Sequence, residues 1–150
     1  MDEEPRWLTA AEQDAWRSFV QLHGKLVGRL SRELQAESGL SDADYGVLVS
    51  LTDVPDGRLR FLDLANAVEW EKSRMSHHIA RMVKRGLVVR EECAEDGRGA
   101  FVVITPAGRE AIAAAAPRHV EAVRRLFIDP LSPEELSTFA KLSRRLLDRM

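Results

Sequence analysis

The segment from Lys72 to Arg90 constrains the possible fold of this chain most. It has apolar residues at helical spacing and contains no Asp or Glu. Apolar residues recur in it at i, i+4, i+7 and i+8, which is the spacing of one buried helix face. These residues are Met75, Ile79, Met82 and Val83. The opposite face carries short polar side chains first and cations later, namely Ser73, Ser76, His77, Arg81 and Lys84. The segment therefore predicts an amphipathic helix with a polar and basic outer face.

Gly86 follows this helix and is free to take a positive φ, so it predicts the helix end. On the outer face, short donors can approach base edges while flanking cations meet phosphates, as in a DNA recognition helix. The net charge of the chain is −2, so nucleic acid would have to be attracted by a local patch such as this one. An ordinary amphipathic helix with a solvated basic face has the same pattern, and the rest of the chain must decide between the two.

Three helices are predicted on the amino-terminal side of this segment. Thr9 and Glu12 have the spacing of a capping box, and the apolar stripe that follows them extends to Gly39. Ser41 is a suitable N-cap for a second helix. Residues 60–67 predict a short third helix. Its expected inward residues are Leu62, Leu64, Ala65 and Val68.

The pattern changes to β-favouring residues after the recognition segment. Residues 87–93 and 101–105 are rich in β-branched and aromatic side chains, and the loop between them holds two glycines and Arg98. These runs predict a β-hairpin. Thr105 and Pro106 then fit the N-cap and first position of another helix.

Two further features concern the carboxyl-terminal helices. Pro117 lies inside the helix that begins at Pro106, so we expect it to bend or break that helix locally. Asp129 and Pro130 close it, and Ser132 begins a last helix through a second capping box.

Short helices followed by a hairpin predict a winged helix-turn-helix over residues 41–105, within a single domain spanning residues 1–150. The fold class is therefore mainly α with a small β-hairpin wing. The terminal helices, residues 9–38 and 107–150, carry more apolar surface than a small winged helix can bury. Two such stripes most simply bury each other across a two-fold interface. The apolar residues concerned are Trp16, Phe19, Leu26, Leu30, Leu126, Phe127, Leu136 and Phe139.

Taken in order, these pieces resemble the MarR family of bacterial regulators over nearly the whole chain. The matching segments are Leu64–Ala65, Ser73–Ile79, Met82–Val88, Asp96–Gly99 and Val103–Gly108. The resemblance implies a homodimer with intertwined terminal helices, often a repressor, which binds a pseudo-palindromic operator in double-stranded DNA. In many members a small lipophilic or phenolic effector releases the DNA. The chain departs from the family at Glu71, where a Ser cap is common, and at Ile104, where Leu is common.

The resemblance also assigns candidate DNA-binding residues. Those expected nearest the bases are Ser73, Arg74, Ser76, His77 and His78, and those nearer phosphates are Lys72, Arg81 and Lys84. Arg74 and His77 are the preferred candidates for base readout. Arg98, between glycines, is the candidate for the wing tip in the minor groove. His78 lies at the edge of the apolar stripe and fits a packed histidine equally well.

Other functions fit the sequence less well. A winged-helix module that binds protein would not need an acid-free face, and Cys93, the only cysteine, has no second cysteine to support redox sensing. His23 and His119 lack a pair at metal-ligand spacing, and no phosphate loop or nucleophile elbow is present. We therefore expect a protein that is not an enzyme and that binds no metal or cofactor. We also expect neither a membrane segment nor a signal peptide. The expected location is the cytoplasm, and effector-binding residues cannot be assigned.

Overall fold

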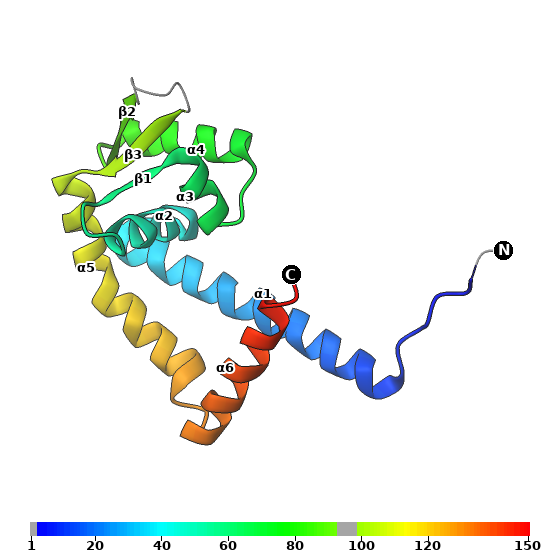
Figure 1. Ribbon diagram of the computed structural model, residues 1–150. Helices are drawn as coiled ribbons and strands as arrows, with labels where there is room; N and C mark the ends of the chain where they lie inside the picture. Colours follow the sequence, from blue (N-terminus) through cyan, green and yellow to red (C-terminus); the bar gives the residue numbers. More distant parts are fainter. Residues whose placement is uncertain (1–2, 93–98) are drawn as a thin grey trace.

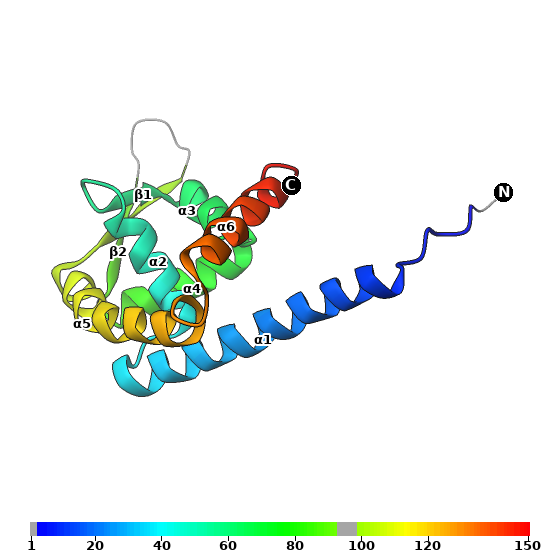
Figure 2. The ribbon, with the colours of Figure 1, turned by 90° about the horizontal axis from the view of Figure 1, so that it is seen from below.

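The computed structural model describes residues 3–92 and 99–150. The element order is α1 (Ala10–Ser38), α2 (Asp42–Thr52), β1 (Arg58–Arg60), α3 (Phe61–Ala67), α4 (Lys72–Lys84), β2 (Val88–Glu92), β3 (Ala100–Ile104), α5 (Pro106–Val123), the π-helical η1 (Arg124–Ile128) and α6 (Pro133–Leu147). A lobe of α2, α3, α4 and the sheet lies at one end, and the amino-terminal half of α1 projects away from it in both views (Figures 1 and 2). The chain after α5 reverses direction and returns as α6. The predicted class, mainly α with a small β wing, is confirmed.

Helix starts follow the capping signals in the sequence. Thr9, Ser41 and Ser132 each accept a hydrogen bond from the backbone N–H three residues later, and the acidic side chain at that position bonds back. These are capping boxes, each of which satisfies two backbone donors at a helix start; they were predicted for α1 and α6, and at α2 the predicted N-cap Ser41 forms one as well. Thr105 is the N-cap of α5 and Pro106 is its first residue, as predicted. Gly86 has a φ of 77°, which confirms its role at the end of α4.

The sheet has three strands in the order β1-β3-β2, all antiparallel. The sequence predicted a two-stranded hairpin and missed β1, whose residues it assigned in part to the third helix. Arg60 pairs with Phe101 and Arg58 pairs with Val103, so β1 covers the free edge of β3. A strand of three residues is too short to show an alternating pattern, and only its pairing with β3 defines it.

The core lies between the sheet and the inner faces of α2, α3 and α4. Its fully buried members include Leu48, Leu51, Leu64, Met75, Ile79, Met82, Val88 and Val102. Two residues predicted to be inward are exposed: Val83 by 39% and Leu62 by 48%. The buried face of α4 is centred between Met75 and Met82, so the position filled by His78 lies inside it and Val83 outside. Leu62 precedes Leu64 by two residues, about 200° around a helix, so both cannot face the core.

The expected break of α5 at Pro117 does not occur, since the helix continues from Pro106 to Val123, and the expected bend there stays a prediction. Proline removes one N–H donor, and the alanines that precede it are strong helix formers. The helical geometry changes later instead, where Arg124–Ile128 form η1. The sequence gives no local signal for this π-helical turn.

Apolar side chains remain exposed on the terminal helices. Trp16 is 58% and Phe19 51% exposed on α1, while Leu146 and Leu147 are 59% and 66% exposed on α6. Phe127 and Phe139 do meet, with ring centroids 5.1 Å apart, and join η1 to α6. One copy of the chain therefore buries only part of these stripes.

Candidate nucleic-acid interface

Helix α4 presents its polar face to solvent. Ser73, His77 and Lys84 are exposed on the side opposite the core, and Ser76 is half-buried beside them. The helix has no acidic residue in its first turn and has Arg81 and Lys84 in its last. Its N-cap residue, Glu71, makes no side-chain capping bond, as expected. A helix face with these properties suits the negative surface of a DNA groove, because the amino-terminal end of a helix also carries a partial positive charge.

Arginines occupy one flank of α4 rather than its outermost face. At about 100° per residue, Arg74, Arg81 and Arg85 fall on a common side, about a quarter turn from the row formed by Ser73, His77 and Lys84. These arginines line a cleft of about 450 Å³ that also borders Gln35, Ser41 and Trp70. The guanidinium of Arg74 lies 4.0 Å from the centroid of the Trp70 ring. Arg74 therefore lies on the flank and His77 on the exposed row, three residues apart on α4, and their part in base readout stays a prediction.

His78 lies in the interior of the protein. Of the two roles that the sequence left open for it, the structure has the packed histidine. The residue is 6% exposed, and its ring meets the edge of Trp70 at a centroid distance of 5.2 Å. Its Nε2 lies 3.0 Å from Oδ1 of Asp44, in a polar contact that is not aligned as a hydrogen bond. Its Nδ1 lies 3.4 Å from Nη2 of Arg81. His78 therefore cannot stand on the exposed face with His77, where it was placed among the candidates for base contact.

Opposing effects act on the pKa of the His78 imidazole. Burial lowers the pKa, Asp44 raises it and Arg81 lowers it again, so that the pKa falls below its ordinary value. Arginine can only donate, so Nδ1 must accept from Arg81, and the proton of the neutral ring lies on Nε2, toward Asp44. The contact between His78 and Asp44 is thus one between a neutral ring and a carboxylate.

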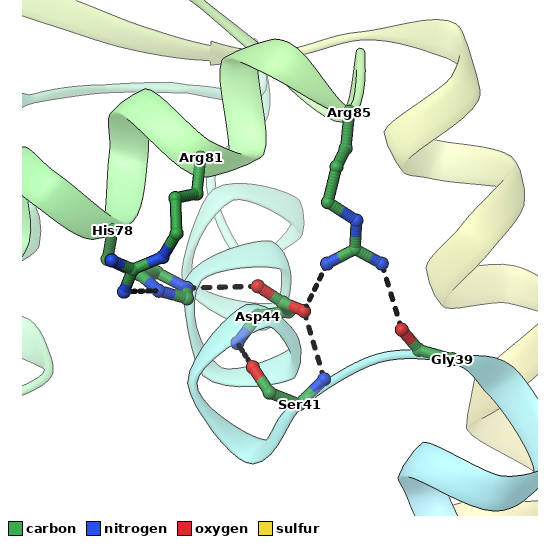
Figure 3. Close-up of polar contacts among 6 residues, drawn as sticks. All are labelled: Gly39, Ser41, Asp44, His78, Arg81 and Arg85. Carbon is green, nitrogen blue, oxygen red and sulfur yellow. Dashed lines mark hydrogen bonds and ion pairs between the residues drawn. The ribbon is translucent and has the colours of Figure 1, made fainter.

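Asp44 is the second buried polar residue of this region, at 3% exposure (Figure 3). Its Oδ2 accepts hydrogen bonds from Nη1 of Arg85 at 2.6 Å and from the backbone N–H of Ser41 at 2.9 Å. Arg85 also donates through Nη2 to the carbonyl of Gly39 at 2.8 Å. Burial raises the pKa of Asp44, but the hydrogen bonds from Ser41 and Arg85 outweigh burial and lower the pKa overall.

The sequence did not reveal this cluster. Asp44 lies three residues after the N-cap Ser41 and completes its capping box, which accounts for it locally. Asp44 and Arg85 lie 41 positions apart, so no local pattern could connect them. The one available signal was His78 itself, a polar residue at the edge of an apolar stripe, which requires a buried partner.

Cations also gather at the base of the wing. The guanidinium of Arg58 lies 4.2 Å from the Phe101 ring centroid and pairs with Glu91 at 3.2 Å, and Arg60 lies 5.0 Å from the same ring. Arg98, the candidate for the minor groove, and Cys93 both lie outside the described residues. The contribution of the wing tip therefore stays a prediction.

The histidines of the terminal helices take part in ring contacts. Within residues 3–92 and 99–150, no group of three or more His, Cys, Asp or Glu side chains could hold a metal ion. His119 instead contacts Tyr45, with ring centroids 4.4 Å apart, and His23 lies beside Phe19. None of the described helices is long and apolar enough to cross a membrane.

Comparisons with known proteins agree with this geometry. Residues 38–99 match the model of the MarR family. The transcriptional regulator HosA of Escherichia coli O127:H6 (strain E2348/69 / EPEC) is 32% identical over 139 residues, covering 93% of this chain and 98% of HosA. Among solved structures, AbsC, a MarR family transcriptional regulator from Streptomyces coelicolor, is 43% identical with a TM-score of 0.92, over 97% of each chain. Sco3205, a MarR family regulator from the same organism solved in complex with DNA, is 41% identical with a TM-score of 0.92, over 98% of this chain and 92% of its own.

Proposed function

This chain is a DNA-binding transcriptional regulator of the MarR family, and from that premise we propose that it acts as a homodimeric repressor on a pseudo-palindromic operator. The observation that carries the proposal is the exposed, acid-free face of α4. A dimer would offer two such faces to one side of the duplex, with half-sites about one helical turn apart.

The DNA contacts divide into two groups in this proposal. Ser73, Ser76 and His77 are short enough to reach base edges from the outer face of α4, while Lys84 reaches phosphate. Arg74, on the flank next to His77, also reads bases, and Arg81 and Lys72 contact the backbone on opposite sides of the exposed row. Arg98 reaches the minor groove from the wing, as expected from the family resemblance.

The dimer is supported by the exposed apolar stripes on α1 and α6. Side chains such as Trp16, Phe19, Leu146 and Leu147 are half-exposed or more, and soluble monomers rarely expose contiguous apolar patches of this kind. Burial across a two-fold axis satisfies both stripes at once, because an isologous interface uses the same surface of both subunits. The terminal helices, residues 9–38 and 107–150, are accordingly the dimerisation region, and residues 41–105 are the DNA-binding region.

A small phenolic or lipophilic effector is proposed to release the DNA. The cleft of about 450 Å³ beside Arg74 has the size of a small-molecule site and places an aromatic ring, Trp70, among cations. Occupation of this cleft would displace groups that contact the flank of α4. Titration of the protein–DNA complex with phenol and with benzoate tests this point, and dissociation by either at a saturable concentration supports it.

The regulatory function implies a location where DNA is accessible, so we infer a cytoplasmic protein without catalytic activity. The rival functions, a protein-interaction module and a redox sensor acting through Cys93, make no use of the face of α4. The deciding experiment is selection of bound duplexes from a random DNA pool, followed by affinity measurements across salt concentrations. An enriched inverted repeat and a steep loss of affinity with salt support repression at an operator. Failure to enrich any sequence would refute it.

A further inference from the structure

We propose that Asp44 is a positioning residue for DNA recognition, whose buried carboxylate sets the rotation and axial placement of α4 against the corner between α1 and α2. The inference rests on the proposed contact between α4 and DNA. It concerns a residue that lies away from the exposed face and, at 3% exposure, cannot touch the duplex itself.

The carboxylate holds α4 at two points. Oδ1 lies 3.0 Å from His78 and Oδ2 lies 2.6 Å from Arg85 (Figure 3). His78 and Arg85 are seven residues apart, so their Cα atoms are separated by two helical turns, or about 10 Å along the axis. One contact would allow α4 to pivot about it. Two contacts from the same side fix both its rotation and its position along the axis.

Asp44 is itself held firmly. Its carboxylate accepts the Ser41 N–H at 2.9 Å, and its own N–H donates to the Ser41 hydroxyl at 3.0 Å, which ties it to the start of α2. Arg85 extends the connection to the carbonyl of Gly39 at 2.8 Å, directly after α1. Gly39 has a φ of 66°, the left-handed conformation that ends α1 and turns the chain into α2. These bonds thereby fix the position of α4 relative to α1, which is a helix of the proposed dimer interface.

The apolar core cannot supply this precision alone. Met75, Ile79 and Met82 fix which face of α4 is buried, but apolar contacts are not directional and tolerate small rotations. With a helix radius, side chains included, of about 5–6 Å, a 10° rotation of α4 moves His77 by about 1 Å. A recognition site requires side chains within about 0.5 Å and 10–20° of the productive geometry. The hydrogen bonds of Arg85 to Asp44 and Gly39 are directional, and the one to Asp44 is charge-assisted, while the close polar contact of His78 adds the second point.

The test compares Asp44→Asn with Asp42→Asn. Both remove one negative charge from the first turn of α2, but Asp42 is exposed and Asp44 buried. Fluorescence anisotropy would measure affinity for the duplex selected from the random pool and for a shuffled duplex, at several salt concentrations. We expect Asp44→Asn to reduce the ratio of the two affinities by about tenfold or more, equivalent to one mismatched base pair. Its salt slope should stay that of the wild type, because the phosphate contacts remain, and Asp42→Asn should keep the wild-type ratio.

A second variant covers the case in which Asp44→Asn does not fold. Arg85→Lys keeps the positive charge at a half-exposed side chain but cannot bridge Asp44 and Gly39, because an ammonium lacks the two-pronged geometry of a guanidinium. We expect the same loss of discrimination. An unchanged ratio in either folded variant, or an equal loss of affinity for both duplexes, would overturn the positioning role. Failure of the wild type to enrich DNA would overturn the proposed function instead, before any variant is compared.

Discussion

At the scale of single residues, the flank of α4 shows how burial decides between a surface and a structural role. His77 and His78 are neighbours in sequence, yet one is exposed and the other is enclosed by Trp70, Asp44 and Arg81. The difference follows from the 100° step of a helix, which places His78 beside Met75 and Met82. A buried imidazole then requires polar partners, and Asp44 and Arg81 meet its two nitrogens.

The stability of the protein should depend on pH through His78. Its pKa is lowered in the folded state, chiefly by burial, so the unfolded state binds the proton more readily. The contribution of neutral His78 to the free energy of unfolding is complete above 6.5, the ordinary pKa of histidine. It is lost as the pH falls through the lower pKa that His78 has in the folded protein. Asp44 on α2, and Arg81 and Arg74 on α4, are the charged groups that act on this ring, and the pKa of Asp44 is lowered below 3.8, outside this range.

Urea unfolding at pH 7 and pH 5 measures this dependence. We expect the free energy of unfolding to fall more in the wild type than in His78→Gln over that interval. His77→Gln, which removes an exposed imidazole from the same helix, should retain the wild-type dependence. Equal pH dependence in wild type and His78→Gln would contradict the assignment.

The backbone conformation of Glu69 should lower the stability of the protein by a measurable amount. It has a φ of 58° in the turn between α3 and α4, and it is the one non-glycine residue with positive φ in the part of the chain that the structure describes. A left-handed conformation costs an ordinary residue about 1–2 kcal/mol, whereas glycine adopts it freely but loses more entropy on folding. We expect Glu69→Gly to raise the free energy of unfolding by about 0.5–1 kcal/mol. Asn66→Gly, inside α3, should lower it, and a loss of stability in Glu69→Gly would show that the turn is not strained.

At the scale of elements, α4 combines a core stripe, an exposed row and an arginine flank, which serve different purposes. Met75, Ile79 and Met82 attach the helix to the lobe, and Ser73, His77 and Lys84 face outward. The flank connects α4 to α1 and α2 through side chains rather than through apolar packing. In the sheet of the same lobe, the short strand β1 and the strand β2 both pair with β3.

The exposed row of α4 predicts a defined salt dependence. Each phosphate neutralised by the protein contributes about 0.9 to the slope of log affinity against log salt. We expect Lys84→Ala to weaken binding to all duplex sequences alike and to reduce the slope by about one contact per subunit. Lys141→Ala, an exposed lysine on α6, is the control and should change neither quantity. A sequence-dependent effect of Lys84→Ala would assign this residue to base readout.

At the scale of the whole molecule, a single copy is incomplete. The amino-terminal half of α1 projects from the lobe, as Figures 1 and 2 show, and its apolar side chains are exposed together with those of α6. In the proposed dimer, the spacing of two α4 helices on DNA depends on how these terminal helices pair. Dimerisation and recognition are thus parts of one geometric arrangement in the proposed function.

Removal of α6 tests the proposed interface. A chain ending at Leu131 lacks the apolar residues Phe139, Leu142, Leu146 and Leu147, so α1 loses the surface expected to cover it. We expect this chain to sediment as a monomer at concentrations where the full-length protein is a dimer. Leu62→Ser removes an exposed apolar side chain from the DNA-binding lobe and should leave the sedimentation unchanged. A truncated chain that still sediments as a dimer would exclude α6 from the interface.

The sequence by itself determined the features that depend on residues three or four positions apart. The capping boxes at Thr9, Ser41 and Ser132, the core stripe of α4 and the end at Gly86 all arise from local hydrogen bonds and helical spacing. The same local patterns, taken in order, were sufficient to identify the family. Capping and periodicity are readable because both partners lie in the same short segment.

Tertiary structure alone decided what depends on partners distant in the chain. Strand β1 exists because β3 pairs with it, and this pairing brings the Arg58 guanidinium to the Phe101 ring. His78 and Arg85 meet across a buried carboxylate that belongs to another helix. A spacing rule cannot specify such contacts, because the side chains approach one another only after the apolar faces of α2, α3 and α4 have packed together.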